Sequence, residues 1–163
     1  MNEKYEKQPP TCVNCGVLNC EYLEKGFPDF CLTKKFEEES SQVLKIYQED
    51  EENMQLMLAA AETEGLFYGK LTRVEEIIYV CKKVGAKKIG IATCVGLVNE
   101  ARIFARMLEA KGLQSYGVVC KVGAVDKTEA GIPAEHKIQK DCHESMCNPI
   151  LQAKILNKEE TDF

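Results

Sequence analysis

The chain has 163 residues, 45% of them hydrophobic, and 26 acidic against 21 basic side chains give it a formal net charge of −5. This composition is typical of a globular protein with a substantial core. The acidic balance, without a basic stripe interleaved with aromatic residues, argues against nucleic acid as the main partner. No apolar run is long enough to span a membrane, and residues 1–10 are polar rather than a signal peptide, so we expect a cytoplasmic protein.

The nine cysteines must then be interpreted for a reducing compartment, where disulfides are rare. Their odd number excludes complete pairing within the chain. Metal ligation or thiol chemistry is the usual role of cysteines in such a protein. A secreted disulfide scaffold is the rival interpretation, but the chain has neither a leader peptide nor a small loop-rich body.

Four cysteines form a cluster near the start of the chain, with the spacing C-x2-C-x4-C-x10-C: Cys12, Cys15, Cys20 and Cys31. The segment that carries them is rich in turn-forming residues and too short to bury enough apolar surface to fold alone. Tetrahedral thiolate coordination of zinc, or ligation of an iron–sulfur cluster, would hold it together. We therefore predict a cysteine-rich metal-binding module over residues 1–35, and the spacing leaves zinc and iron–sulfur open.

Residues 36–163 are expected to form an α/β domain that begins with helices. Apolar residues at 43–47 lie among acidic runs, and a strongly helix-forming stretch at 54–61 is expected to stop near Gly65. The acidic runs lack the pattern of a calcium-binding loop, so we interpret them as a solvated helix face rather than a cation site.

A further helix is expected to begin at Thr72, which forms a capping-box signature with Glu75. Apolar residues follow at helical spacing as far as Cys81, and Gly85 is expected to end the helix. Cys81 lies within this apolar stripe, so we predict that it is a core residue rather than a ligand.

A strand–helix–strand unit follows. Residues 87–93 predict a buried parallel strand, 95–111 a helix and 115–120 a second strand. This order makes a βαβ unit with a parallel pair. Asn148 and Pro149 provide an N-cap and a first-turn proline for a last helix that runs to about residue 156.

The predicted fold class is therefore α/β, a small parallel sheet with flanking helices. Two parallel strands alone do not make a stable sheet, and both faces of such a sheet need cover. Either a partner chain completes the sheet, as in a homo-oligomer, or the sequence is truncated at its C-terminus. The polar residues that follow the last helix resemble the approach to another strand, which favours truncation after Phe163.

A second group of cysteines surrounds the expected sheet edge. Cys94 and Cys120 each follow a predicted strand, and the carboxyl ends of neighbouring parallel strands meet at one crevice where ligands bind. Cys142, His143 and Cys147 occupy the loop before the last helix and are expected to fold over the same edge. The starts of the following helices favour the thiolates of Cys94 and Cys147. We predict a cofactor-binding crevice formed by Cys94, Cys120, Cys142 and Cys147, against the alternative of inert small residues beside a sheet.

Four segments resemble one known family: residues 12–20, 30–32, 90–97 and 146–153. It is the uncharacterised cysteine-rich metal-binding protein family of bacteria and archaea, a domain of unknown function. The resemblance implies metal binding at the four N-terminal cysteines and a second site at those of the α/β body. It also implies that a further strand follows the equivalent of Phe163, with part of the second site beyond it.

Three functions remain open from the sequence. The first is a metal or iron–sulfur protein with a second metal or cluster at Cys94, Cys120 and Cys147, linked to a redox partner protein or a small-molecule substrate. The second is a thiol enzyme with a structural zinc, in which Cys94 is the nucleophile, Cys120 or Cys147 resolves the intermediate and His143 is the base. The third is a non-enzymatic interaction protein stapled by zinc.

Overall fold

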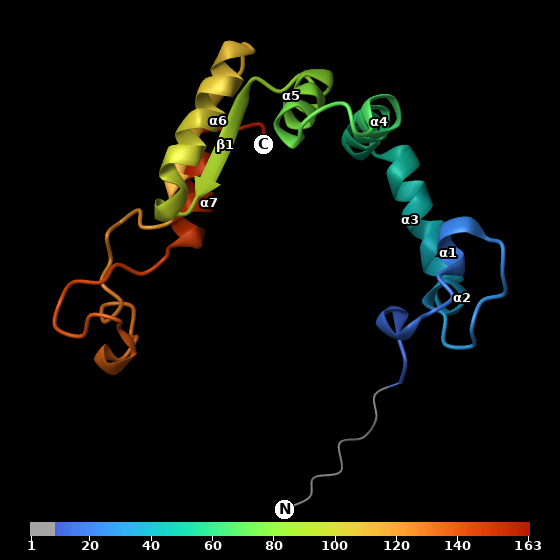
Figure 1. Cartoon of the computed structure of the whole chain (residues 1–163), viewed down its shortest axis with the longest axis horizontal. Helices are drawn as coiled ribbons and strands as arrows, with labels where there is room; N and C mark the ends of the chain where they lie inside the picture. The colour runs from blue at the N-terminus through green and yellow to red at the C-terminus, as the bar shows by residue number, and fades with distance from the viewer. Residues whose placement is uncertain (1–8) are drawn as a thin grey trace, which may run out of the picture. The chain divides into compact units, whose positions relative to one another are not determined.

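The structure is a computed structural model that describes residues 9–163, and it divides into two compact units between Met57 and Leu58 (Figure 1). The first unit contains the cysteine-rich segment, and the second contains the sheet. Our sequence-based boundary after residue 35 falls between two helices of the first unit.

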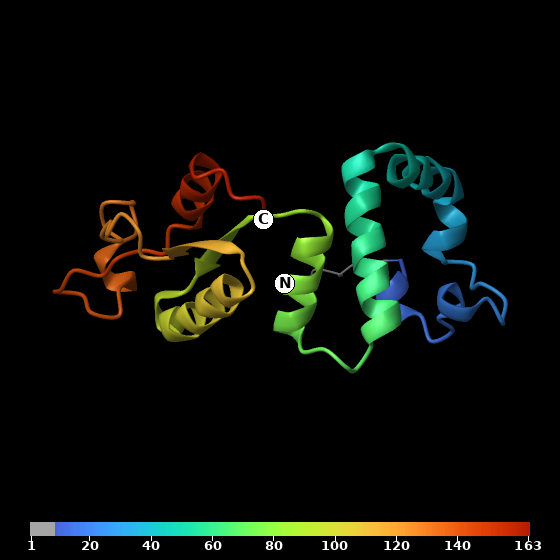
Figure 2. The same cartoon turned by 90° about the horizontal axis from the view of Figure 1, so that it is seen from above.

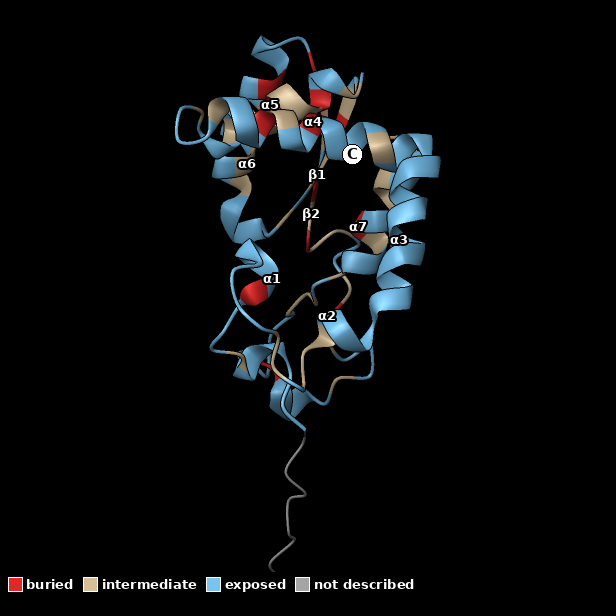
Figure 3. Ribbon diagram, turned by 90° about the vertical axis from the view of Figure 1, so that its right-hand side faces the viewer, coloured by how far each residue is buried: buried red, intermediate tan, exposed pale blue. Residues whose placement is uncertain are grey.

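The first unit is a succession of short turns and helices. It comprises a 3-10 turn at Cys12–Asn14, α1 (Asn19–Tyr22), α2 (Leu32–Lys35), α3 (Glu37–Glu49) and the beginning of α4 (Glu51–Phe67). No residue of α3 is buried, and its acidic first turn is exposed, as expected for a solvated face (Figure 3).

The second unit contains the remaining described elements. They are the end of α4, α5 (Arg73–Lys83), β1 (Lys88–Thr93), a 3-10 turn at Val95–Leu97, α6 (Val98–Ala110), β2 (Gln114–Val119), a 3-10 turn at Ala134–His136 and α7 (Pro149–Lys158). Residues 121–147, which connect β2 to α7, form a long loop that includes the 3-10 turn at Ala134–His136. No helix of the described residues is long and apolar enough to cross a membrane.

The two strands pair in parallel, with Lys88 opposite Gln114 and Thr93 opposite Val119. This confirms the expected small parallel sheet. Helices α6 and α7 lie on opposite faces of the pair (Figure 2). Residues 162–163 run along the other edge of β1, where the Asp162 N–H donates to the Lys88 carbonyl at 2.8 Å and the Gly90 N–H donates to the Phe163 carbonyl at 2.6 Å.

The hydrophobic core of the second unit lies between α5, β1 and α6. Its buried members are Ile78, Cys81, Ile89, Leu108 and Leu113. The expectation that Cys81 is a core residue is confirmed, since only 4% of it is exposed and burial raises the pKa of its thiol. A free thiol in this setting acts as a small apolar side chain.

Local capping signals set the helix ends where the sequence predicted them. The Thr72 backbone N–H donates to the Glu75 carboxylate at 2.8 Å, and the Glu75 N–H donates back to the Thr72 hydroxyl at 3.4 Å. The Asn148 side chain accepts from the Leu151 N–H at 3.1 Å, with Pro149 in the first turn. Both helix starts are therefore confirmed.

The expected end of α4 near Gly65 is confirmed to within two residues, because the helix ends at Phe67 with Gly65 inside its last turn. A glycine inside a helix costs about 1 kcal/mol relative to alanine, which packing can offset. Phe67 packs edge-on against Tyr79 of α5 with ring centroids 5.0 Å apart, and Tyr79 donates its hydroxyl to Glu62 at 2.5 Å. These contacts keep the last turn of α4 helical.

Candidate cysteine sites

All four N-terminal cysteines line one small cavity, of about 40 Å³, in the first unit. Apolar side chains supply most of its remaining wall: Leu18, Phe27, Pro28, Phe30 and Leu32. Cys15 and Cys31 are half-buried, whereas Cys12 and Cys20 are exposed. The segment therefore folds so that residues nineteen positions apart, Cys12 and Cys31, border the same apolar space.

Two tight backbone features bring these cysteines together. Leu18 and Leu23 adopt the left-handed conformation, with φ of 50° and 58°, on either side of the short helix α1. Such conformations are uncommon for leucine and cost free energy that the surrounding structure must offset. Asn19, only 6% exposed, accepts the Lys25 N–H at 2.6 Å and so ties together the two ends of this loop.

Backbone and side-chain donors point at two of the sulfurs. The Leu18 N–H donates to Cys15 Sγ at 3.5 Å. Burial opposes ionisation of Cys31, but hydrogen bonds from the Thr33 hydroxyl and from the backbone of Thr33 and Lys34, with the Lys34 charge, lower its pKa overall. The segment thus stabilises negative charge on sulfur, which a metal ligand requires.

Within residues 9–163, no three Cys, His, Asp or Glu side chains are already arranged closely enough to hold a metal ion. The four cysteines border one cavity without converging on one point. Metal sites of this kind commonly form together with the fold around them.

Two members of the second group, Cys94 and Cys120, directly follow β1 and β2, as predicted. Cys120 follows β2 and is 8% exposed. Its backbone N–H donates to the Thr93 carbonyl at 2.8 Å, and its carbonyl accepts the Asn148 N–H at 2.7 Å. Its sulfur accepts the Val95 N–H at 3.4 Å. Cys120 therefore connects both strand ends to the starts of the following helical segments.

Cys147 immediately precedes the cap of α7, and its sulfur lies 3.8 Å from that of Cys120. Cys147 is exposed, whereas Cys120 is buried. The structure thus brings together two of the four cysteines that the sequence placed in this crevice.

Among the described residues, no hydrogen bond joins the sulfurs of the other two cysteines to this pair. Cys94 caps the 3-10 turn after β1 and is exposed, and its sulfur makes no hydrogen bond to Cys120 or Cys147. Cys142 is exposed in the long loop. His143, the base expected for a Cys94 nucleophile, instead contacts Ser145 through Nε2 at 2.8 Å and faces Asp126 through Nδ1 at 3.5 Å.

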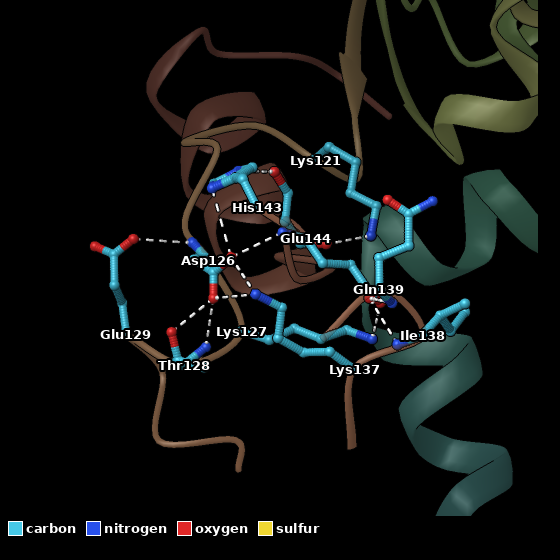
Figure 4. A network of polar contacts seen from close by, with 11 residues as sticks. Lys121, Asp126, Lys127, Thr128, Glu129, Lys137, Ile138, Gln139, His143 and Glu144 are labelled. Carbon is cyan, nitrogen blue, oxygen red and sulfur yellow. Dashed lines mark hydrogen bonds and ion pairs between the residues drawn. The ribbon is translucent and has the colours of Figure 1, made fainter. Parts of the chain in front are cut away.

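A polar network folds the long loop on itself (Figure 4). Buried Asp126 accepts from Thr128 at 2.7 Å, from Lys137 Nζ at 3.0 Å and from the Glu144 N–H at 2.8 Å. These donors, with the Thr128 hydroxyl foremost, hold the pKa of Asp126 well below its usual range. Glu144 in turn pairs with Lys127 and accepts the Ile138 N–H at 2.7 Å. These contacts join residues of the long loop to one another, and Cys142 and His143 lie within the part of the loop that they join.

Sequence reasoning missed Gln152, which is 6% exposed in α7. Its side-chain amide donates to the Thr93 carbonyl at 3.1 Å and to the Val118 carbonyl at 2.8 Å. The helix is thereby joined to the ends of both strands. The sequence marks this residue only as a single amide side chain between the apolar residues Leu151 and Ile155.

The fold and its cysteines define a small α/β protein with an N-terminal cysteine-rich segment. Residues 31–163 match the family described as "Protein of unknown function (DUF1847)", and the chain belongs to this family. Cys12, Cys15 and Cys20 precede the matched region. The family assignment carries no activity, so the metal binding implied by the resemblance remains a prediction.

The chain is also similar to the uncharacterized protein MJ0455 of Methanocaldococcus jannaschii. The two are 48% identical over 113 residues, which are 69% of this chain and 56% of the relative. The chain thus spans little more than half the length of this curated relative. No solved structure gives a significant match.

Proposed function

We propose that the protein binds one metal ion through the thiolates of Cys12, Cys15, Cys20 and Cys31, and that this ion is structural zinc. The observation that carries the proposal is that all four cysteines border one cavity with apolar walls. Four thiolates are a common ligand set for structural zinc.

The four thiolates that border the cavity would complete the tetrahedral coordination of one zinc ion without any further ligand. The N–H donor to Cys15 and the donors around Cys31 would stabilise the sulfurs as thiolates and orient them. When bound, zinc supplies a fixed tetrahedral centre and no redox chemistry.

The segment needs such a centre for its own stability. Val13, Leu18, Tyr22 and Leu23 are each more than half exposed, so little apolar burial holds residues 12–31 in place. Ligation by thiolates from both ends of the segment would contribute folding free energy directly.

The test is metal analysis of the full chain purified without oxygen, together with its visible absorption spectrum. We expect one zinc per chain and no visible band, and loss of the zinc in Cys15→Ser and Cys31→Ser. Cys142→Ser is the matched control, because Cys142 is an exposed cysteine of the second unit. Iron with sulfide and a visible band would replace zinc by an iron–sulfur cluster, whereas full metal content in Cys15→Ser and Cys31→Ser would refute the site.

A chelator separates a structural ion from a surface contaminant. We expect removal of zinc to expose residues 12–31 to proteases while the core of the second unit stays protected. Protection of residues 12–31 that does not change on chelation would contradict a structural role.

A further inference from the structure

Cys120 and Cys147 form a pair whose chemistry is independent of the N-terminal segment. Their sulfurs lie 3.8 Å apart, although 26 residues separate them in the chain. From the geometry we propose that this pair is a redox-active dithiol, which exchanges with low-molecular-weight disulfides and closes into an intramolecular disulfide.

The backbone around both cysteines is held by hydrogen bonds, so bond formation needs little rearrangement. The Asn148 N–H donates to the Cys120 carbonyl at 2.7 Å, which fixes the residue after Cys147 against Cys120 itself. The Asn148 side chain also caps α7. Closing the gap from 3.8 Å to the 2.05 Å of a disulfide then falls to the two side chains.

The difference in exposure assigns the two roles. Cys147 is exposed and can meet a disulfide from solution, whereas Cys120 is 8% exposed and cannot. The Val95 N–H donates to Cys120 Sγ at 3.4 Å and thus offers a hydrogen bond to negative charge on that sulfur. Cys147 is therefore the attacking thiol, and Cys120 is the resolving thiol.

The reaction balances in two exchange steps. The Cys147 thiol loses its proton and attacks one sulfur of the disulfide RSSR, forming a mixed disulfide and releasing RS⁻, which takes up a proton. The Cys120 thiol then loses its proton and attacks the Cys147 sulfur, which breaks the mixed disulfide and releases a second RS⁻ that is protonated in turn. The protein is oxidised by two electrons, and RSSR is reduced to two RSH.

The experiment equilibrates the full chain, without oxygen, in buffers of bis(2-hydroxyethyl) disulfide and 2-mercaptoethanol. Products are mapped by mass spectrometry after cleavage by trypsin. Cys120 lies in the peptide of residues 112–121 and Cys147 in that of residues 141–154, which also contains Cys142. Cys142→Ser serves as the matched control, because it removes this ambiguity and leaves the pair intact.

We expect the two peptides to become linked in the wild type and in Cys142→Ser. A neighbouring thiol acts at an effective concentration of about 1 mM or more, so at about 0.1 mM mercaptoethanol the bridge should exceed the mixed disulfide by about tenfold. Cys120→Ser should accumulate the mixed disulfide on Cys147. In Cys147→Ser the buried Cys120 should remain a free thiol.

Three results would overturn the proposal: a wild type that stops at the mixed disulfide, a bridge from Cys147 to a different cysteine, or a Cys147 that reacts no faster than buried Cys81. Zinc content is measured on the same samples. A failed N-terminal metal site with an intact bridge, or the converse, therefore separates this inference from the proposed function.

Discussion

Replacing Gln152 by leucine tests whether one buried amide holds α7 to the sheet. The Gln152 side chain donates at 3.1 Å to Thr93 and at 2.8 Å to Val118, and it is only 6% exposed. Leucine keeps most of the volume and removes both donors. A hydrogen bond contributes about 1 kcal/mol net, so the loss of two should lower the free energy of unfolding of the second unit by about 2 kcal/mol.

Amide hydrogen exchange of β1 and β2 is the appropriate assay, because it reports on the second unit alone. A loss of about 2 kcal/mol should speed the exchange of the slowest strand amides by about thirtyfold. Lys154→Gln is the matched control, since Lys154 is exposed on the same helix and should change stability by less than about 0.5 kcal/mol. Strand exchange in Gln152→Leu equal to that in Lys154→Gln would refute the reasoning.

Gln152→Glu tests the same two contacts through the direction in which stability changes with pH. A carboxyl at this position faces two carbonyl oxygens, which favour its protonated form, so its pKa in the folded state should exceed its unfolded value of about 4.3. The variant should therefore be least destabilised below that pH and lose stability as the pH rises. A variant whose loss of stability relative to the wild type is smaller at pH 7 than at pH 4 would contradict the assigned contacts.

Three further predictions concern other parts of the second unit. Thr72→Ala removes the N-cap acceptor of α5 and should lower stability by about 1 kcal/mol in urea unfolding, and an unchanged midpoint would contradict the cap. Gly90→Ala places a Cβ 3.0 Å from Thr161 Oγ1 and should destabilise by about 1–3 kcal/mol, whereas Gly117→Ala meets nothing within 4 Å and should not, so equal urea midpoints for the two variants would refute the packing. Because hydrogen bonds lower the pKa of Asp126 in the fold, its contribution is complete above the unfolded pKa of about 3.9 and should be lost as the pH falls below it. Exchange of loop amides that stays constant from pH 6 to acid conditions, after correction for intrinsic rates, would show that the network does not hold the loop.

The elements that the sequence predicted correctly carry their signals locally. The capping residues of α5 and α7 lie within three positions of the groups they bind, so a short stretch of sequence contains the whole interaction. The strands 88–93 and 114–119 are two apolar runs separated by one amphipathic helix, which is the local signature of a parallel pair. The fold class therefore followed from short-range information.

The features that sequence reasoning missed depend on partners far along the chain. Gln152 is held by carbonyl groups of Thr93 and Val118, 59 and 34 positions away, and no local pattern marks an amide for that role. The last turn of α4, beyond Gly65, likewise depends on a contact outside the helix, since Phe67 packs on Tyr79 across a turn. Tertiary contacts of this kind override local propensity.

In the candidate sites, too, local sequence predicted one part of the arrangement, whereas the rest depends on the tertiary fold. Placing Cys94 and Cys120 after strands predicted that both would lie at one edge, and the partner of Cys120 is one of the two loop cysteines proposed for it. Cys142 could not be excluded beforehand, because its distance from Cys120 depends on how the loop folds. That folding rests on Asp126 and its donors, which are charged and polar residues without a recognisable motif.

The long loop between β2 and α7 leaves and returns at nearly the same point. The carbonyl of Cys120, where the loop departs, accepts the N–H of Asn148, where it ends, at 2.7 Å. Inside the loop, Asp126 and Ser145 pair in an antiparallel bridge that joins its two arms. Because this hydrogen bond joins the two ends of the loop, the length of the loop can change between homologous sequences while the end of β2 stays beside the start of α7.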